Sequence, residues 1–195
     1  MTIAIKEIIG GLAALIGLIN IGIYFLTIIR GQITPHFFTW VIWTFTNAII
    51  FAAQYLDAGG PGAWQTGVTS IACGVIAITA ISHGEHNITR TDWAAFVCAL
   101  GALPIWFLTH NPLASVLTLT VVDSIGFYPT FRKAFQEPYR ENAGWTFSAA
   151  FVYSLSIMAL TNYDWTTLLY PVAMIGWQGG LGVMLLWRRS TVKKN

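Results

Sequence analysis

Seven long apolar runs divide this chain, and short polar segments or segments rich in glycine and proline separate them. The runs cover residues 8–28, 36–56, 62–82, 93–109, 113–131, 144–161 and 166–187. A helix needs about 20 mostly apolar residues to cross ~30 Å of hydrocarbon, and these runs have about that length. They are too long for barrel strands and do not alternate polar with apolar residues as such strands do. The pattern therefore predicts seven transmembrane helices.

The composition supports a membrane protein. Of the 195 residues, 55% are hydrophobic and only 9% are charged, whereas soluble domains carry about a quarter of charged residues. The net charge of +2 gives no reason to expect nucleic acid as a partner. Both cysteines, Cys73 and Cys98, lie inside apolar runs, which indicates small buried residues and not a disulfide framework. The partner that the composition predicts is the lipid bilayer.

Lysine and arginine predict the orientation of the spans, because short cytoplasmic loops are enriched in these residues. With seven spans, nine of the ten lysines and arginines fall on one side and Lys6 alone falls on the other. We therefore expect the N-terminus outside and the C-terminus in the cytoplasm, with the protein in the plasma membrane, for a bacterium the inner membrane. A missed or an extra helix would mix the charges between the two sides.

The first and the last three spans resemble each other. The segment GIYF (22–25) matches GFYP (126–129), and WTFT (43–46) matches WTFS (145–148). Both third spans carry Gly-Trp-Gln segments, at 62–67 and 176–180, and Asn20 and Ser124 hold matching places. Chance similarity between apolar segments is the competing explanation. A tandem copy of three spans would insert upside down, so the span between the copies restores the orientation.

The predicted fold is therefore an all-α integral membrane protein with two parallel three-helix-bundle repeats and a linker helix. The first bundle takes residues 1–90, the linker helix 91–111, and the second bundle with a basic tail 112–195.

The segment YPTFRKAFQEPYRENAGWTFSAAF (128–151) resembles a PQ-loop segment, in which Pro-Gln precedes basic residues, a short loop and the next helix. The whole 3+1+3 plan is similar to the SWEET sugar transporters, to the wider PQ-loop superfamily and to bacterial carriers of nicotinamide riboside. Thr130 stands where glutamine would follow Pro129, and Phe25 stands at the matching proline position of the first copy. The resemblance implies a carrier with a central cavity lined by asparagine and tryptophan. In this chain, Asn47 and Trp177 are the residues that would line such a cavity.

Polar side chains near the middle of the predicted spans are the candidate site. An ionisable residue within a membrane is costly and is a functional candidate by default, so Asp123 comes first, also as the candidate proton-coupling group. The alternative is a structural hydrogen-bond centre that ties helices together. The other candidates for solute binding are amides, hydroxyls, aromatic rings and one thiol: Asn47, Ser70, Cys73, Tyr153, Ser154, Trp177 and Gln178.

Three further residues are candidates for gates or hinges. Pro129 removes a backbone donor and would kink its helix, and Trp43 and Trp145 lie where they would narrow the cytoplasmic mouth. Pro104 and Pro171 would bend the fourth and seventh spans. Such features are also common in helix bundles that do not move.

These patterns predict a transporter that moves a small polar solute, such as a sugar, a vitamin precursor or an amino acid, by alternating access between the two bundles. Transport would be facilitated diffusion or coupled to protons. The alternative from another class is a seven-helix sensor or assembly subunit that does not transport. The chain shows no phosphate-binding loop, no zinc-protease pattern and no serine-hydrolase pattern, so we expect neither an enzyme nor a cofactor or metal. A homo-oligomer is compatible with this interpretation.

Overall fold

The computed structural model describes residues 2–31, 35, 37–84, 90, 93–94, 97, 101, 104, 108, 111–136, 138–139 and 142–192, with the backbone alone at 38, 125–126, 128–130 and 132–133. This part of the chain is helical and contains no strand. Its elements are α1 (Ile3–Ile29), α2 (Phe37–Leu56), the 3-10 helix η1 (Gly60–Ala63), α3 (Trp64–His83), α5 (Pro112–Gln136), α6 (Ala143–Ala159) and α7 (Trp165–Thr191).

The predicted spans at 8–28, 36–56, 62–82, 113–131, 144–161 and 166–187 are confirmed as helices. The helices α1, α5 and α7 run further than the apolar runs do, because helical hydrogen bonding continues through polar residues beyond the hydrocarbon. Most of the predicted span 93–109 lies outside the described residues, and those of its residues that are described are helical.

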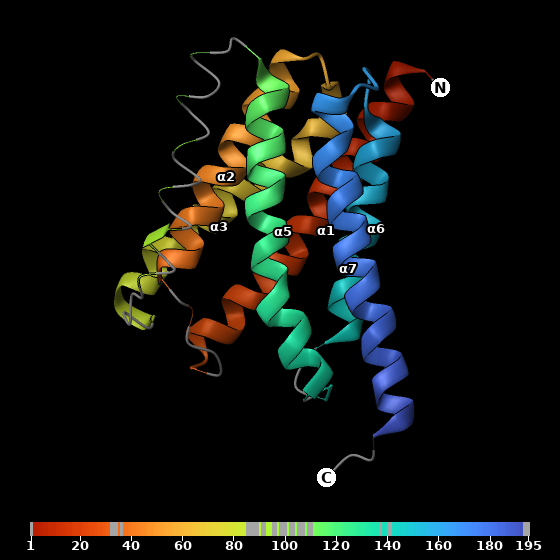
Figure 1. The fold of residues 1–195 in the computed structure, drawn as a ribbon. Coiled ribbons are helices and arrows are strands. Elements are labelled where there is room, and N and C mark those ends of the chain that lie inside the picture. The colour runs from red at the N-terminus through yellow and green to blue at the C-terminus, as the bar shows by residue number, and fades with distance from the viewer. Residues whose placement is uncertain are drawn as a thin grey trace.

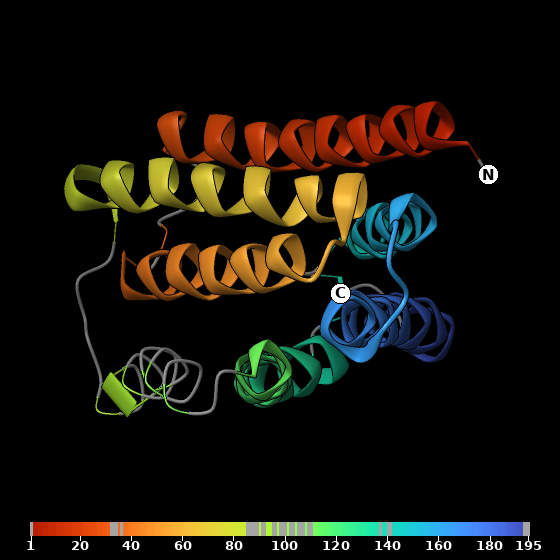
Figure 2. The same cartoon turned by 90° about the horizontal axis from the view of Figure 1, so that it is seen from above.

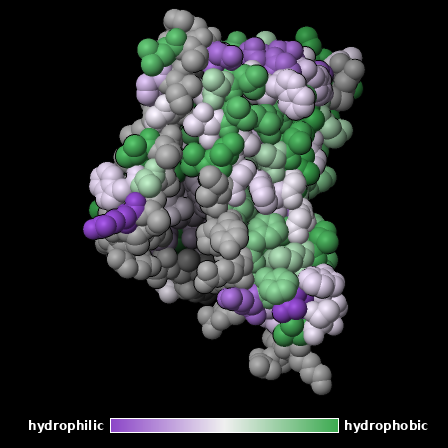
Figure 3. All heavy atoms as spheres, in the orientation of Figure 1, coloured by the Kyte–Doolittle hydropathy of each residue, from purple (hydrophilic) through white to green (hydrophobic). Residues whose placement is uncertain are grey.

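Three described helices are long and apolar enough to cross a membrane: α1, η1 with α3, and α7. One side of α1 supports this reading, because large aliphatic side chains recur along it with about half or more of their surface exposed: Ile5, Ile8, Leu12, Leu15, Ile19, Ile23 and Leu26. Only lipid or another apolar surface makes such exposure favourable over a whole helix. Figure 3 shows hydrophobic residues across the middle of one face and hydrophilic residues towards its ends.

The helices form two rows of three. In the first triad, α3 lies between α1 and α2, and in the second triad, α7 lies between α5 and α6. Across the two triads, α1 packs against α6 and α2 packs against α5. Figure 2 shows α1, α3 and α2 side by side in one layer, steeply inclined to α5, α6 and α7, which are seen nearly end-on. The two triads therefore meet closely at one end of the molecule and diverge towards the other (Figure 1).

We call the end at which α1 begins, together with the loops 57–60 and 160–164, the N-end, and the opposite end the C-end. Towards the N-end the triads share one core, in which Ile50 and Ala53 of α2 pack with Leu119 of α5 and Met174 of α7. Towards the C-end each triad has a core of its own. The first contains Ile28, Trp40 and Ile76, and the second contains Ala134, Leu181 and Leu185.

Close contacts fix the two triads to each other at the N-end. Within the first triad, Gly10 of α1 lies directly against η1, because a Cβ at position 10 would come within 2.5 Å of the Pro61 carbonyl oxygen. Ser156 Oγ of α6 donates a hydrogen bond to the Gly62 carbonyl, and the Thr161 backbone N–H donates to the Gly59 carbonyl at 3.1 Å. Lys6 Nζ donates to the Leu160 carbonyl at 2.5 Å. The loop and η1 of the first triad thus lie directly on the α6–α7 connection.

A proline in α7 adds another link between the triads. Pro171 lies inside α7 and has no N–H, so the Thr167 carbonyl, four residues earlier, lacks its usual helical donor. Gln54 of α2 supplies the missing bond, because its Nε2 donates to the Thr167 carbonyl at 3.1 Å. Both residues are fully buried. A helix defect in the second triad is therefore satisfied by a side chain of the first.

Candidate functional site

Asp123 lies near the middle of α5 and faces α7. Its Oδ2 accepts a hydrogen bond from the Tyr170 hydroxyl at 3.1 Å. The Asp123 side chain is half-buried, whereas Tyr170 is buried in the core that the two triads share. The structure therefore places the candidate carboxylate between helices, beside the shared core.

Several aromatic side chains lie near Asp123 along the axis of α5. The rings of Tyr153 of α6 and Tyr170 meet edge to face, with centroids 6.0 Å apart and planes at 83°. Trp177 Nε1 donates to Ser124 Oγ at 2.8 Å. Phe127, one turn beyond Asp123, stacks on Trp177 with centroids 5.8 Å apart and planes at 14°.

Tyr170 and Trp177 converge on the same point of α5. They leave α7 on the same face, two turns or about 10 Å apart along its axis. Yet their polar atoms bond to the neighbouring residues Asp123 and Ser124. One ring therefore approaches the Asp123 level from the N-end and the other from the C-end.

The first triad contributes one polar group to the same region. Gln65, near the start of α3, interacts with Tyr153 of α6. The polar cluster of Asp123, Tyr170, Tyr153 and Gln65 therefore spans both triads. Cys73 of α3 is buried in the first triad's own core, with Ile28, Trp40 and Ile76.

Three buried amide oxygens in the described residues have no hydrogen-bond partner: Asn47 Oδ1, Gln54 Oε1 and Gln65 Oε1. Asn47 is 4% exposed, and its Nδ2 donates to the Trp43 carbonyl of its own helix at 2.9 Å. Gln65 Nε2 donates to Thr69 Oγ1 at 3.0 Å. A buried acceptor without a donor costs free energy, so these oxygens are where a polar group from outside the chain would gain most.

Three predicted site residues make no hydrogen bond to the polar cluster in the part of the chain that the structure describes. Ser70 Oγ donates to the Thr44 carbonyl at 2.9 Å and so ties α3 to α2. Ser154 Oγ donates to the Ala150 carbonyl of its own helix at 2.9 Å. Gln178 is half-buried on α7.

The predicted gate residues lie towards the C-end. Trp43 is 41% exposed and meets the edge of Trp40 at 5.1 Å. Trp145 is half-buried in the first turn of α6, where its backbone N–H donates to Asn142 Oδ1 at 3.2 Å. Pro129 falls inside α5, which is assigned as one helix, and its side chain lies outside the described residues.

One expected correspondence between the copies is wrong in register. Trp64 is the first residue of α3, whereas Trp177 lies in the middle of α7. α7 begins at Trp165, so Trp165 and not Trp177 is the counterpart of Trp64. Asn20 and Ser124 also have different partners, because Asn20 Nδ2 donates across the triads to Ser148 Oγ at 2.9 Å, whereas Ser124 bonds within the second triad.

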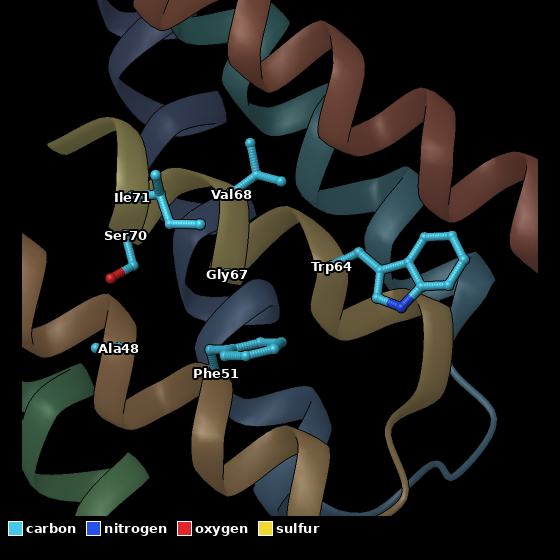
Figure 4. A pocket seen from close by; sticks show the side chains of 7 residues that line it. All are labelled: Ala48, Phe51, Trp64, Gly67, Val68, Ser70 and Ile71. Carbon is cyan, nitrogen blue, oxygen red and sulfur yellow. The ribbon is translucent and has the colours of Figure 1, made fainter. Parts of the chain in front are cut away.

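A groove of about 360 Å³ lies between α2 and α3 (Figure 4). Its lining residues are Ala48, Phe51, Trp64, Gly67, Val68, Ser70 and Ile71. Two of them, Ile71 and Trp64, are 72% and 41% exposed, so the groove opens on the outer surface of the first triad. The groove is almost wholly apolar and is distinct from the polar cluster.

Sequence reasoning missed Tyr170 and Gln65. Both lie within long apolar runs, at 166–187 and 62–82, and no motif singles them out. A tyrosine hydroxyl inside a membrane span needs a hydrogen-bond partner, and this requirement was the available signal for Tyr170. Gln65 lies at the end of its span, where an amide is ordinarily assigned to the membrane surface.

Two carboxyl groups meet at the N-end, outside the spans. A side-chain hydrogen bond with Asp164 raises the pKa of Asp57. Burial alone would raise the pKa of Asp164, but hydrogen bonds from Asp57 and from the Thr167 and Thr166 backbone lower it. Asn162 Nδ2 joins the pair, donating to the Asp57 carbonyl at 3.0 Å and to Asp164 Oδ2 at 2.6 Å. Asp57 directly follows α2 and Asp164 caps α7, so this pair lies where the ends of the two triads meet.

Comparison with family models, with curated proteins and with solved structures finds no match for this chain.

Proposed function

We propose that this protein is a membrane carrier that moves a small polar solute by alternating access between its two triads. The observation that carries the proposal is the polar cluster around Asp123. Side chains of α3, α5, α6 and α7 meet there, at mid-helix depth, in a chain with few charges. Intramembrane carboxylates that face other helices are characteristic of solute and proton pathways.

The pattern of helix neighbours supports the proposed 3+1+3 plan. The pairs α1–α3, α2–α3 and α1–α6 have the counterparts α5–α7, α6–α7 and α5–α2. Exchanging the two triads leaves this list of pairs unchanged, as an approximate two-fold axis along the membrane normal would require. The site then lies near that axis, between the triads.

The difference between the two ends supports a rocking motion. The N-end is held by a shared core and by hydrogen bonds between the triads, while each triad is internally packed at the C-end. A carrier closed on one side and able to open on the other needs this arrangement. With the charge-based orientation, the closed N-end faces outside and the C-end faces the cytoplasm.

The same polar cluster also suits the alternative, a sensor or assembly subunit that does not transport. Packing of Phe127, Trp177 and Tyr170 against the shared core favours this alternative, since a filled centre would hold the triads together without a solute. Transport itself separates the two functions.

The test is uptake into liposomes that contain the purified protein, with labelled sugars, amino acids and nucleosides, each with and without a pH gradient. We expect at least one solute to enter faster than into protein-free liposomes. Asp123→Asn keeps an oxygen that can accept from Tyr170 but cannot ionise. If Asp123 couples transport to protons, this variant loses accumulation driven by the gradient and keeps exchange.

Ser154→Ala is the matched control, because Ser154 bonds only to the Ala150 carbonyl of its own helix. Uptake should be the same in this variant as in the wild type. Folded protein that moves none of the solutes in the panel, including cationic ones, would contradict the carrier and leave the sensor or assembly subunit.

A further inference from the structure

Asp123 has no cationic partner among the residues that the structure describes. Its one hydrogen bond comes from a neutral tyrosine hydroxyl. The described cations that make contacts lie at the ends of the helices. Lys6 bonds to the Leu160 carbonyl and Arg188 to the Phe135 carbonyl, while Arg189 bonds to the Pro138 carbonyl and lies over Tyr139. An ionised carboxylate at this depth therefore has its charge balanced by nothing in the described structure.

The surroundings of Asp123 have the chemistry of a cation site. The rings of Tyr170 and Trp177 reach Asp123 and Ser124 through their polar edge atoms, and Phe127 stacks on Trp177 beside them. Aromatic faces attract cations through the ring quadrupole, and the attraction is stronger when the site is desolvated. A carboxylate among such rings favours a positively charged group whose own hydration is weak.

Access to this point is also present. Asp123, Ser124, Phe127 and Trp177 all retain accessible surface, in contrast to Tyr170, which is 3% exposed. The partly exposed residues at this level are therefore one acidic, one hydroxyl-bearing and two stacked aromatic residues.

We propose that the solute held at Asp123 is a small organic cation, of the substituted-ammonium class, with its charge against the carboxylate and its carbon groups against the rings of Trp177 and Phe127. This inference rests on the proposed function and narrows its substrate class. Inorganic cations fit less well, because the polar cluster offers one carboxylate and few further oxygens, while such ions need several oxygen ligands.

The test compares choline with its uncharged isostere 3,3-dimethyl-1-butanol, which has the same shape without the charge. Equilibrium binding of labelled choline to the purified protein is measured in detergent, with the isostere as competitor. We expect choline to bind, and to bind at least about tenfold more tightly than the isostere, which corresponds to about 1.4 kcal/mol.

Two pairs of variants make the test specific. Asp123→Asn should lose the preference for choline over the isostere, while Ser154→Ala should keep it. Trp177→Phe retains an aromatic face and should bind choline within about threefold of the wild type, whereas Trp177→Leu should weaken binding by about tenfold. Thermal unfolding of each variant verifies that the protein is folded.

The outcomes separate this inference from the proposed function. Absence of choline binding, or equal binding of choline and the isostere, would overturn the cation assignment, and so would unchanged selectivity in folded Asp123→Asn. Uptake of a neutral solute with no cation binding would overturn it and keep the carrier. Selective choline binding without uptake of any solute would support the cation site and contradict the carrier.

Discussion

The two ends of this helix bundle are built in different ways. At the N-end, residues of both triads enter one core, and loop groups such as the Gly59 carbonyl are bonded across the boundary. At the C-end, the core around Ile76 belongs to the first triad and the core around Leu185 belongs to the second. The comparison teaches that separating the triads would cost most at the N-end. Towards the C-end each core belongs to one triad, and the Asn20–Ser148 hydrogen bonds link the two.

The largest expected effect comes from truncating one leucine in each kind of core. Leu119 and Leu185 are both fully buried, and replacing either with alanine should cost about 2–5 kcal/mol of stability. Leu119→Ala opens the shared core, so amide hydrogen exchange should accelerate in both α2 and α7. Leu185→Ala should accelerate exchange in α6 and α7 and leave α2 unchanged. Equal acceleration in α2 for both variants would contradict the division of the cores.

A smaller effect is expected at the contact between α1 and η1. Gly10→Ala places a methyl group against the Pro61 backbone, which cannot move aside as a flexible side chain can. We expect a loss of about 1–3 kcal/mol in thermal or denaturant unfolding. Gly11→Ala is the matched control, because a Cβ there meets nothing within 4 Å, and alanine should stabilise the helix by up to about 1 kcal/mol. Equal stabilities for the two variants would show that the N-end contact is loose.

The smallest effect is a pH dependence of the N-end loops. The raised pKa of Asp57 means that its stabilising contribution is present at low pH and is lost as pH rises through its folded-state pKa. The lowered pKa of Asp164 gives the opposite sign, with stability lost as pH falls through its folded-state pKa. The Thr161 amide bonds to the Gly59 carbonyl, so its protection from hydrogen exchange, after correction for the intrinsic rate at each pH, should be highest between these two values.

Asp57→Asn provides the control for this prediction. An amide donates to Asp164 at every pH, so the loss of protection at higher pH should disappear while the loss at lower pH remains. A variant that keeps the full pH profile of the wild type would assign the dependence to other groups.

The sequence predicted the helices because their cause is local. About 20 apolar residues in succession, ended by glycine, proline or charge, determine a span without reference to the rest of the chain. The inclination of the two triads was not predictable in this way. It depends on contacts between distant residues of the two triads, such as Lys6 with Leu160 and Ser156 with Gly62, and no local pattern specifies such pairs.

The candidate site was predicted in part for the same reason. Depth along a helix indicated Asp123, Tyr153, Cys73 and Trp177, and the structure places all of them except Cys73 in or beside the polar cluster. Cys73 lies in the core of the first triad. Depth does not determine which side of a helix a residue occupies. Ser154 has the right depth, yet its hydroxyl bonds within its own helix.

Pro171 also bears on how the protein is assembled in the membrane. Until Gln54 reaches it, the Thr167 carbonyl lacks the helical donor that Pro171 cannot supply. Ribosomes synthesise α2 long before α7, so the donor is already present when the acceptor is made. In a chain that began with the second triad, α7 would be made before this partner existed.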